Sequence, residues 1–556
     1  MALRINFNYS AAVTQTALEQ NNRLMNKSLL RLSTGLRILN AADDSAGLFI
    51  ADQLALVSAA LEQGNRNIQT GISALQIAEN AAGQIFNRLQ SIYVKAQNAA
   101  NDINDPNARA ALQREIQNLV DAIQKIGTDT EYNGIKLLDG SFQNKYIHYG
   151  PRSGQVVNIS ISDLRASSLG AYIASGSGAT SNVTAAYSIG GTLANVTANL
   201  GNNFVLQGST EYVSVANIVV YQGGATAELV DAAKLARAIN SNTTLQQLGI
   251  EAVASNESVA NTVYDNPVTG VTTAAGLDGL PTYVDVNLNF YIGDGSVKFT
   301  VNLGTVTIAD GGGSVSYDIA TLDELVNRIN TQSDAVAAPI KAINEGGKLK
   351  FVTDSGETIA IEAEITVNGD DFQNLTIDFS QLIEFGPDAT TTTATLDGIN
   401  RFAAVAKTGR IEIAGVDSYL FDYAGVSDSP SAPAPGNKGL AFQIDPNTNV
   451  GLQSLYSIDV STNAGAERAM LIVKKAIQKV DTVRSQIGAV MNNLQSIYDA
   501  QKVAMDNTRE AENVIRNVDF AQEMATFTTM QIRMQAGIAM LAQANALPQL
   551  VLQLLR

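Results

Sequence analysis

The sequence lacks several residue types on which protein chemistry commonly depends. Among its 556 residues there is no cysteine, no tryptophan and one histidine, His148. Without cysteine there are no disulfides or thiolate metal sites, so nothing covalent prevents the chain from being handled unfolded. One histidine excludes the two-histidine zinc motif, and no phosphate loop or dinucleotide fingerprint occurs. We therefore predict no catalytic, cofactor-binding or metal site, and we interpret His148, in YIHYG, as an ordinary strand residue.

Long hydrophobic runs are also missing. No run of eighteen apolar residues occurs, so we expect no transmembrane helix. The N-terminus, MALRINFNYSAAVTQ, has no apolar stretch followed by a cleavage site, so we expect no cleavable secretory signal. Hydrophobic residues nevertheless make up 45% of the chain, which is enough for several buried cores.

Negative charge is concentrated in the middle of the chain. Residues 176–440 contain 11 Lys+Arg and 29 Asp+Glu, a net charge of -18, whereas the remaining residues contain 25 and 24, a net charge of +1. Acidity disfavours nucleic acid as a partner. It suits a solvated surface that must not associate with itself, while the nearly neutral ends suit packing against other helices.

Both ends of the chain are predicted to be helical. Between residues 50 and 92 apolar residues recur at alternating spacings of four and three, which predicts a helix roughly 65 Å long that buries a narrow stripe. Glycines at two stripe positions, Gly64 and Gly71, indicate close backbone approach. A second heptad pattern covers residues 470–498 and is interrupted by Arg484. The predicted coiled-coil seam comprises Ile50, Leu54, Val57, Leu61, Ile68, Leu75, Leu89, Val473, Ile477, Val480, Ile487 and Leu494.

Local signals punctuate the N-terminal part. Asp44 or Ser45 is a possible cap at the start of the long helix. Pro106 precedes a second helix, for which Gly127 is a plausible C-cap. Asn133-Gly134 and Asp139-Gly140 mark turns between apolar runs, and QVVNISIS at 155–162 alternates as a strand does.

The middle of the chain is predicted to be rich in β-strands, including VDVNLNFYI, VKFTVNLGTVTI, LKFVT and RIEIAG. Two helical stretches interrupt them. LARAIN at 235–240 is followed after nine residues by IEA, and LVNRIN at 325–330 is followed after nine residues by IKA, an offset of 90 residues. We interpret this as a duplicated module. The pair Asp370-Asp371 is interpreted as a turn and residues 427–439 as a linker.

The outermost helices and the C-terminal tail are unusually apolar. Six large aliphatics lie in ALPQLVLQLLR, and Pro548 is expected to interrupt the helix there. An intramolecular hairpin absorbs part of these surfaces, but an exposed tail is a liability. Burial against other copies, through different patches on identical subunits, generates rings or helical filaments. The predicted filament-core residues are Leu18, Met25, Leu29, Leu32, Phe520, Met524, Phe527, Met534, Ile538, Leu541, Leu547, Leu550, Val551, Leu552, Leu554 and Leu555.

We therefore predict a multidomain α+β fold, with paired N- and C-terminal coiled-coil helices forming an inner core and β-rich outer domains inserted between them. The predicted segments are an inner-core helix and spoke (1–45), a long-helix domain with a hairpin (46–175), acidic outer domains (176–440) with two modules at about 205–260 and 290–362, the returning long helix (441–507) and a C-terminal inner-core helix (508–556).

Both ends resemble bacterial flagellin, the subunit of the flagellar filament. LSTGLRILNAADDSAGL at 32–48 is close to the family's LSSGLRINSAKDDAAGL, and EYNGIKLLDG at 131–140 resembles its hairpin segment. AENVIRNVDFAQEMATFTTMQIRMQAGIAMLAQANALPQLVLQLLR matches in register to the last residue. The resemblance covers roughly 1–170 and 450–556, and the duplicated modules are similar to an Ile-Asn repeat of flagellins and hook proteins.

The resemblance implies a life cycle and a set of partners. The subunit is exported unfolded by the flagellar type III apparatus with an export chaperone, assembles beneath a cap on hook–filament junction proteins, and polymerises with itself into an extracellular filament. Its terminal segments order on polymerisation. Nucleic acid and membrane insertion are not implied.

One family feature is altered. In many flagellins the segment matching residues 89–101 carries an Arg and a Leu that contact the vertebrate innate receptor for flagellin. Here Ser91 stands at the position of that Arg and Lys95 at that of the Leu, while Glu115 matches the family's acidic residue. We expect this chain to be poorly sensed by that receptor.

Three alternatives remain. A hook–filament junction protein has similar termini and does not catalyse a reaction. An enzyme carried on the filament surface would reside within residues 176–440. A trimeric coiled-coil adhesin would form a fixed small oligomer rather than a long tube.

Overall fold

The computed structural model describes residues 8–554 except 102, 179, 181–183, 186–199, 207–211, 219–230, 274–279, 294, 296, 311–313, 370–371, 387–388, 390 and 423–449. The chain forms two compact units. One comprises Met1–Asn80, Thr130–Ser162 and Arg484–Arg556, and the other comprises Ala81–Asp129 and Asp163–Val483. The helices Ser45–Ala99 and Asn463–Arg516 each contribute residues to both units, so the units do not correspond to the domains expected from the sequence. The domain boundaries expected from the sequence stay predictions.

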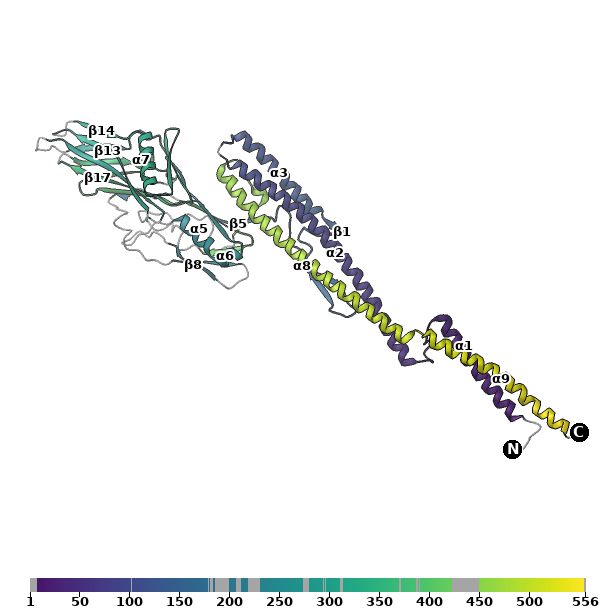
Figure 1. Cartoon of the computed structure of the whole chain (residues 1–556). Helices are drawn as coiled ribbons and strands as arrows, with labels where there is room; N and C mark the ends of the chain where they lie inside the picture. Colours follow the sequence, from purple (N-terminus) through teal and green to yellow (C-terminus); the bar gives the residue numbers. More distant parts are fainter. Residues whose placement is uncertain are drawn as a thin grey trace. The chain divides into compact units, whose positions relative to one another are not determined.

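Three long helices flank the β-rich region in sequence, as predicted (Figure 1): α2 (Ser45–Ala99), α3 (Pro106–Asp129) and α8 (Asn463–Arg516). The first begins where predicted, because the Gly47 amide donates to the Asp44 carboxylate at 2.8 Å and Asp44 thereby caps the helix. The cap of α3 is Asp105, which accepts from the Ala108 amide at 2.7 Å, while Pro106 occupies the first helical position.

The heptad stripes of α2 and α8 are largely buried. Leu61, Ile68, Leu75 and Leu89 are buried in α2, and Val473, Val480, Ile487 and Leu494 are buried in α8. Leu54, Val57 and Ile477 are half-buried. The two helices run antiparallel in the first unit, where Arg509 pairs with Glu62 at 2.8 Å and Arg484 pairs with Glu79 at 2.9 Å. Arg484, which interrupts the apolar stripe, thus has an acidic partner on α2.

The seam prediction is wrong at its first position. Ile50 is 50% exposed. The last residue of α8, Arg516, pairs with Asp52 at 3.5 Å, so α8 ends opposite that point of α2 and Ile50 lies beyond the paired region.

By length and composition alone, α2 is the one helix among the described residues that is apolar enough to cross a membrane. Its stripe is buried in the protein, however, and two ion pairs join its polar positions to α8. Core helices of helical assemblies pass the same test of composition, so we treat α2 as a core helix.

The two stripe glycines admit a ribbon of two strands, β3 (Lys145–His148) and β4 (Val156–Ile159). A Cβ atom on Gly64 would lie 1.8 Å from the Tyr149 carbonyl oxygen, and one on Gly71 would lie 1.9 Å from Cδ1 of Ile147. The Gln501 amide of α8 donates to the same Tyr149 carbonyl at 2.7 Å. The close approach predicted at these glycines is therefore made by the ribbon.

Local turn signals are confirmed, with one correction. A hairpin joins β1 (Glu131–Tyr132) to β2 (Ile135–Lys136), and its turn residues Asn133 and Gly134 have φ of 49° and 79°. Gly127 is not a C-cap, because α3 continues to Asp129. Its buried position instead accommodates the Arg165 backbone, since a Cβ atom there would lie 3.0 Å from the Arg165 Cα.

The middle of the chain is built of antiparallel sheets, and the four strands quoted from the sequence are all present. The largest sheet has the order β14-β13-β12-β17-β20-β6, and smaller sheets have the orders β23-β5-β21-β9, β10-β16-β15, β11-β18-β19 and β22-β7-β8. The strands are β5 (Gly170–Gly176), β6 (Thr184–Ala185), β7 (Leu200–Leu206), β8 (Tyr212–Ile218), β9 (Glu251–Ser255), β10 (Glu257–Val259), β11 (Val268–Thr273), β12 (Thr282–Ile292), β13 (Val297–Ile308), β14 (Val315–Ile319), β15 (Ile340–Glu345), β16 (Lys348–Thr353), β17 (Ile359–Asn368), β18 (Phe372–Asp378), β19 (Thr393–Asp397), β20 (Phe402–Lys407), β21 (Arg410–Gly415), β22 (Tyr419–Asp422) and β23 (Leu452–Ser454).

The duplicated sequence corresponds to a duplicated contact. Helix α5 (Ala232–Ser241), which is followed by the short α6 (Thr243–Gln247), lies against β9, and α7 (Leu322–Ala335) lies against β15. The Asn240 side chain donates to the Ala252 carbonyl at 2.7 Å and accepts from the Ala252 amide at 2.9 Å. The Asn330 side chain makes the same two bonds with Ala342, at 2.9 and 2.8 Å. One asparagine in each copy thus holds a helix on the outer edge of a strand.

A polar cluster joins the first module to the strands of the second. Asp231 caps α5 and also accepts from the Thr358 amide at 3.0 Å, while Arg237 lies 3.4 Å from the Glu357 carboxylate. Burial raises the pKa of Asp231 to about 6, with nearby Glu357 acting in the same direction. The turn expected at Asp370-Asp371 and the linker expected at 427–439 lie outside the described residues.

Gly64→Ala is predicted to destabilise the folded chain by about 1–3 kcal/mol, because the added methyl group meets a backbone carbonyl that cannot rotate away. Gly83→Ala, in the same helix, is the matched control. A Cβ atom there meets nothing within 4 Å, so the change should leave stability unchanged or raise it by up to about 1 kcal/mol. Urea unfolding of both variants measures the difference in the free energy of unfolding. Equal free energies for the two variants would contradict the close contact between residue 64 and the Tyr149 carbonyl.

Candidate assembly surface

The first and last helices, α1 (Tyr9–Thr34) and α9 (Phe520–Leu554), lie side by side and antiparallel (Figure 1). Polar side chains connect them at intervals. The Asn21 side-chain amide donates to the Met530 carbonyl at 2.8 Å, and the Ser28 hydroxyl donates to the Glu523 carboxylate at 2.5 Å. The pairing of the N- and C-terminal helices predicted from the sequence is therefore confirmed.

The segment that follows α1 is hydrogen-bonded to the segment that precedes α9. Gly35 has φ of 72° and ends α1, after which its carbonyl accepts from the Val518 amide at 2.9 Å. The Arg37 amide donates to the Arg516 carbonyl at 2.8 Å. Lys27 of α1 lies 2.5 Å from the Asp43 carboxylate, and its hydrogen bond holds the pKa of that carboxyl below its ordinary value.

The stripe through which α1 and α9 contact each other consists largely of small, polar or flexible residues. The partly buried positions of this stripe follow a heptad spacing in both helices. Gly537 leaves room for the Leu18 side chain, because a Cβ atom at residue 537 would lie 2.8 Å from the Leu18 Cδ1. Predicted core residues on this stripe are Leu18, Met25, Leu32, Phe527, Met534 and Leu541. The other sheltered positions are Ala11, Thr14, Asn21, Ser28, Glu523, Met530, Gly537 and Ala544.

Large apolar side chains lie outside this stripe. Four predicted residues, Leu29, Phe520, Met524 and Ile538, are more than half exposed. Asn21 and Ser28 of α1 instead lie in this contact and hydrogen-bond to α9. Seven large apolar side chains of the pair are each 51–64% exposed: Leu29, Leu30, Phe520, Met524, Ile532, Ile538 and Met540.

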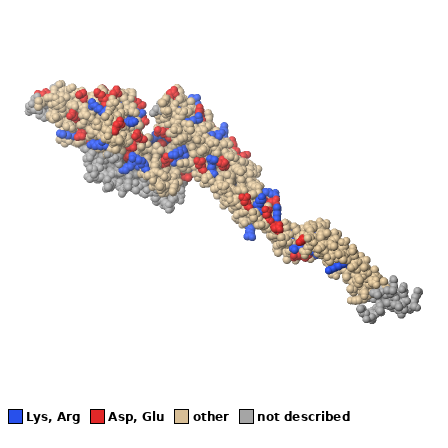
Figure 2. Space-filling model, in the orientation of Figure 1, with Lys and Arg blue, Asp and Glu red and all other residues tan. Residues whose placement is uncertain are grey.

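Helix α9 is also poor in charge. Only Glu523 and Arg533 carry charge among the 35 residues of α9. Figure 2 accordingly shows a nearly uncoloured surface over the described part of these two helices, in contrast with the mixed charges elsewhere on the visible face. A surface with exposed large apolar residues and few charges is suited to burial against another protein.

The prediction that Pro548 interrupts the last helix is wrong. Helix α9 continues to Leu554 and includes predicted tail residues Leu547, Leu550, Val551, Leu552 and Leu554, whose side chains lie outside the described set, as does Leu555 entirely. Proline removes one backbone donor but leaves the neighbouring helical bonds in place.

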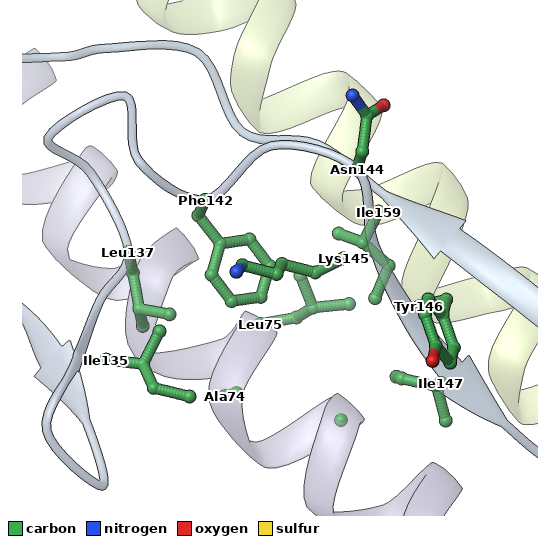
Figure 3. A pocket seen from close by; sticks show the side chains of 11 residues that line it. Ala74, Leu75, Ile135, Leu137, Phe142, Asn144, Lys145, Tyr146, Ile147 and Ile159 are labelled. Carbon is green, nitrogen blue, oxygen red and sulfur yellow. The ribbon is translucent and has the colours of Figure 1, made fainter.

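A second apolar surface lies where the ribbon meets α2. A pocket of about 400 Å³ is lined mainly by apolar side chains, with Leu75 of α2 facing Phe142 (Figure 3). Its rim includes Ile135 and Tyr146, which are 49% and 66% exposed. We identify no chemistry beyond apolar contact at this pocket.

Two of the three residues at the receptor-segment positions contact each other. Lys95 of α2 forms an ion pair with Glu115 of α3, and Ser91 is exposed one turn earlier on α2. The family's acidic residue is therefore engaged by a cation in this chain.

His148 lies exposed in β3, in agreement with its interpretation as a strand residue. Across the described ranges, no group of three or more His, Asp or Glu side chains is arranged to hold a metal ion.

Paired terminal helices with outward apolar faces, long antiparallel helices and a β-rich insertion define the subunit of a self-assembling helical polymer. Family models described as the bacterial flagellin N-terminal and C-terminal helical regions match residues 5–143 and 470–555. The chain belongs to the bacterial flagellin family and is a subunit of the extracellular flagellar filament.

Relatives match over their whole length. The flagellins of Aquifex pyrophilus and Aquifex aeolicus are 49% and 47% identical over 560 and 564 residues, and flagellin B of Helicobacter pylori is 30% identical over 571, each covering 100% of both chains. The solved structure of FliC from Burkholderia pseudomallei is 15% identical, covers 76% of this chain and 99% of its own, and has a TM-score of 0.26. The full-length flagellin matches favour the filament subunit over the junction protein.

Proposed function

We propose that the outward apolar faces of α1 and α9, together with the C-terminal tail, form the inner wall of the filament by packing against neighbouring copies. The observation that carries the proposal is the mismatch within the pair. Its internal seam mixes large apolar residues with small and polar ones, while further large apolar side chains such as Leu29, Phe520 and Ile532 stay exposed.

The energies are adequate for assembly. Fully burying a large apolar side chain contributes about 1.5–3 kcal/mol, so half-exposed residues on two helices contribute on the order of 10 kcal/mol per subunit when covered. Association costs roughly 4–15 kcal/mol, a range that includes this gain, so burial of the tail as well moves the balance further toward assembly. Contacts between different patches of identical subunits do not close and extend as a helix.

The same proposal assigns the rest of the chain. Residues 1–45 and 508–556 form the inner core, residues 46–175 and 441–507 form the next shell, and the acidic region 176–440 faces outward. The subunit is exported unfolded by the flagellar export apparatus and its chaperone, and it meets the cap and the hook–filament junction proteins on assembly. Its role is structural and not catalytic, without cofactor, nucleic acid or membrane insertion.

Removing Leu550–Arg556 is predicted to leave a soluble folded chain that does not polymerise, because part of the apolar wall is lost. Ile532→Lys should have the same effect, since Ile532 is 61% exposed on α9. Ile399→Lys is the matched control, because Ile399 is 91% exposed in the acidic region. Seeded growth from filament fragments, followed by negative-stain microscopy, measures assembly. Normal filaments from the truncation or from Ile532→Lys would contradict the proposal.

We further propose that the innate receptor for flagellin senses this chain poorly, because Ser91 and Lys95 replace the contacting Arg and Leu and Lys95 occupies Glu115. The double substitution Ser91→Arg with Lys95→Leu is predicted to raise activation of receptor reporter cells by at least tenfold. Substituting exposed residues of the acidic region in the same way serves as the control. Strong activation by the unaltered monomer would refute the proposal.

A further inference from the structure

The unbroken course of α9 through Pro548 leaves one backbone carbonyl without its usual donor. In an α-helix the amide of residue 548 would donate to the carbonyl of residue 544, and proline has no amide hydrogen. Ala544 is 8% exposed, so its carbonyl has little access to water. A buried carbonyl in this position requires another donor.

Asn8 supplies that donor. Its side-chain amide nitrogen donates to the Ala544 carbonyl at 2.9 Å. The oxygen of the same side chain accepts from the Ala11 amide at 3.2 Å, which makes Asn8 the N-cap of α1. Both ends of one amide group are therefore used, one to start the first helix and one to fill a gap in the last helix.

A second asparagine shows why this contact is particular. Asn21 also donates to a carbonyl of α9, that of Met530, at 2.8 Å. Residue 534 is a methionine and has an amide hydrogen, so the Met530 carbonyl already has its ordinary helical donor. Asn21 adds a bond to a satisfied carbonyl, whereas Asn8 satisfies a carbonyl that Pro548 leaves unpaired.

We infer that Asn8 and Pro548 act as a matched pair, in which proline frees one carbonyl of α9 and asparagine uses it to fix the register of α1 on α9. Sliding α1 by one turn along α9 leaves the Ala544 carbonyl buried and unpaired, so alternative registers are disfavoured. Asn8 is thus a positioning residue for assembly. This inference rests on the proposed role of the terminal helices in the filament wall.

The test uses the full chain and the critical concentration for elongation of seeded filaments. Asn8→Asp retains the oxygen that caps α1 but cannot donate to Ala544. It is expected to raise the critical concentration about five- to tenfold, which corresponds to about 1–1.4 kcal/mol. In the Pro548→Ala background, residue 548 gains an amide hydrogen that occupies the Ala544 carbonyl, so Asn8→Asp is expected to change the critical concentration by less than about twofold.

Asn21→Ala is the matched control, because Pro548→Ala supplies nothing to Met530. Its effect is expected to be the same factor in both backgrounds. An equal effect of Asn8→Asp in both backgrounds would overturn the inference.

If Pro548→Ala does not assemble, the comparison of Asn8→Asp with Asn8→Ala decides the matter. Equal losses support the inference, since the cap survives in only one of them, and wild-type assembly of Asn8→Asp overturns it. Assembly of the tail truncation would instead defeat the proposed function. If the truncated chain does not assemble but Asn8→Asp forms normal filaments, the inference about Asn8 is wrong and the proposed function stands.

Discussion

Two helices packed against each other can bury only one stripe on each, and the terminal helices of this chain are apolar on more than one. Bulky residues such as Leu18 and Phe527 share the internal stripe with Asn21 and Ser28, yet Leu29, Phe520 and Ile538 remain more than half exposed. The surface of one subunit is therefore completed by another subunit. Charge, secondary structure and the position of the outer domains along the sequence are consistent with this single requirement.

The long helices meet a different requirement, since their seam is satisfied within the chain. Buried leucines and isoleucines, two ion pairs and a ribbon seated at two glycines hold α2 and α8 together in the first unit. The contrast with α1 and α9 is one of composition. The seam of α1 and α9 mixes large apolar residues with polar ones, and other large apolar side chains stay exposed, so we propose that this pair depends on its neighbours for stability.

Much of the fold could be predicted from local chemistry. The Asp44 cap, the Asn133-Gly134 turn and the alternating strands each depend on a few neighbouring residues, and the structure contains all of them. The 90-residue repeat likewise predicted a duplicated module, and the structure shows that one asparagine holds the helix in each copy. What sequence did not show was which partner meets each surface. Gly64 indicated a close approach but not that the ribbon of β3 and β4 makes it. Local chemistry predicts that Pro548 interrupts the helix. In the structure, the Ala544 carbonyl that loses its donor at Pro548 accepts instead from Asn8, more than 500 residues away in the chain.

The central claim is that α1 and α9 depend on neighbouring copies for their stability. Backbone hydrogen exchange of the full chain, as monomer and as filament, tests it directly. The account predicts that amides of residues 520–554 exchange rapidly in the monomer and become protected in the filament, whereas amides of β12 and β17 exchange slowly in both. Equal protection of residues 520–554 in the monomer would show that the helix pair is stable alone and would contradict the account.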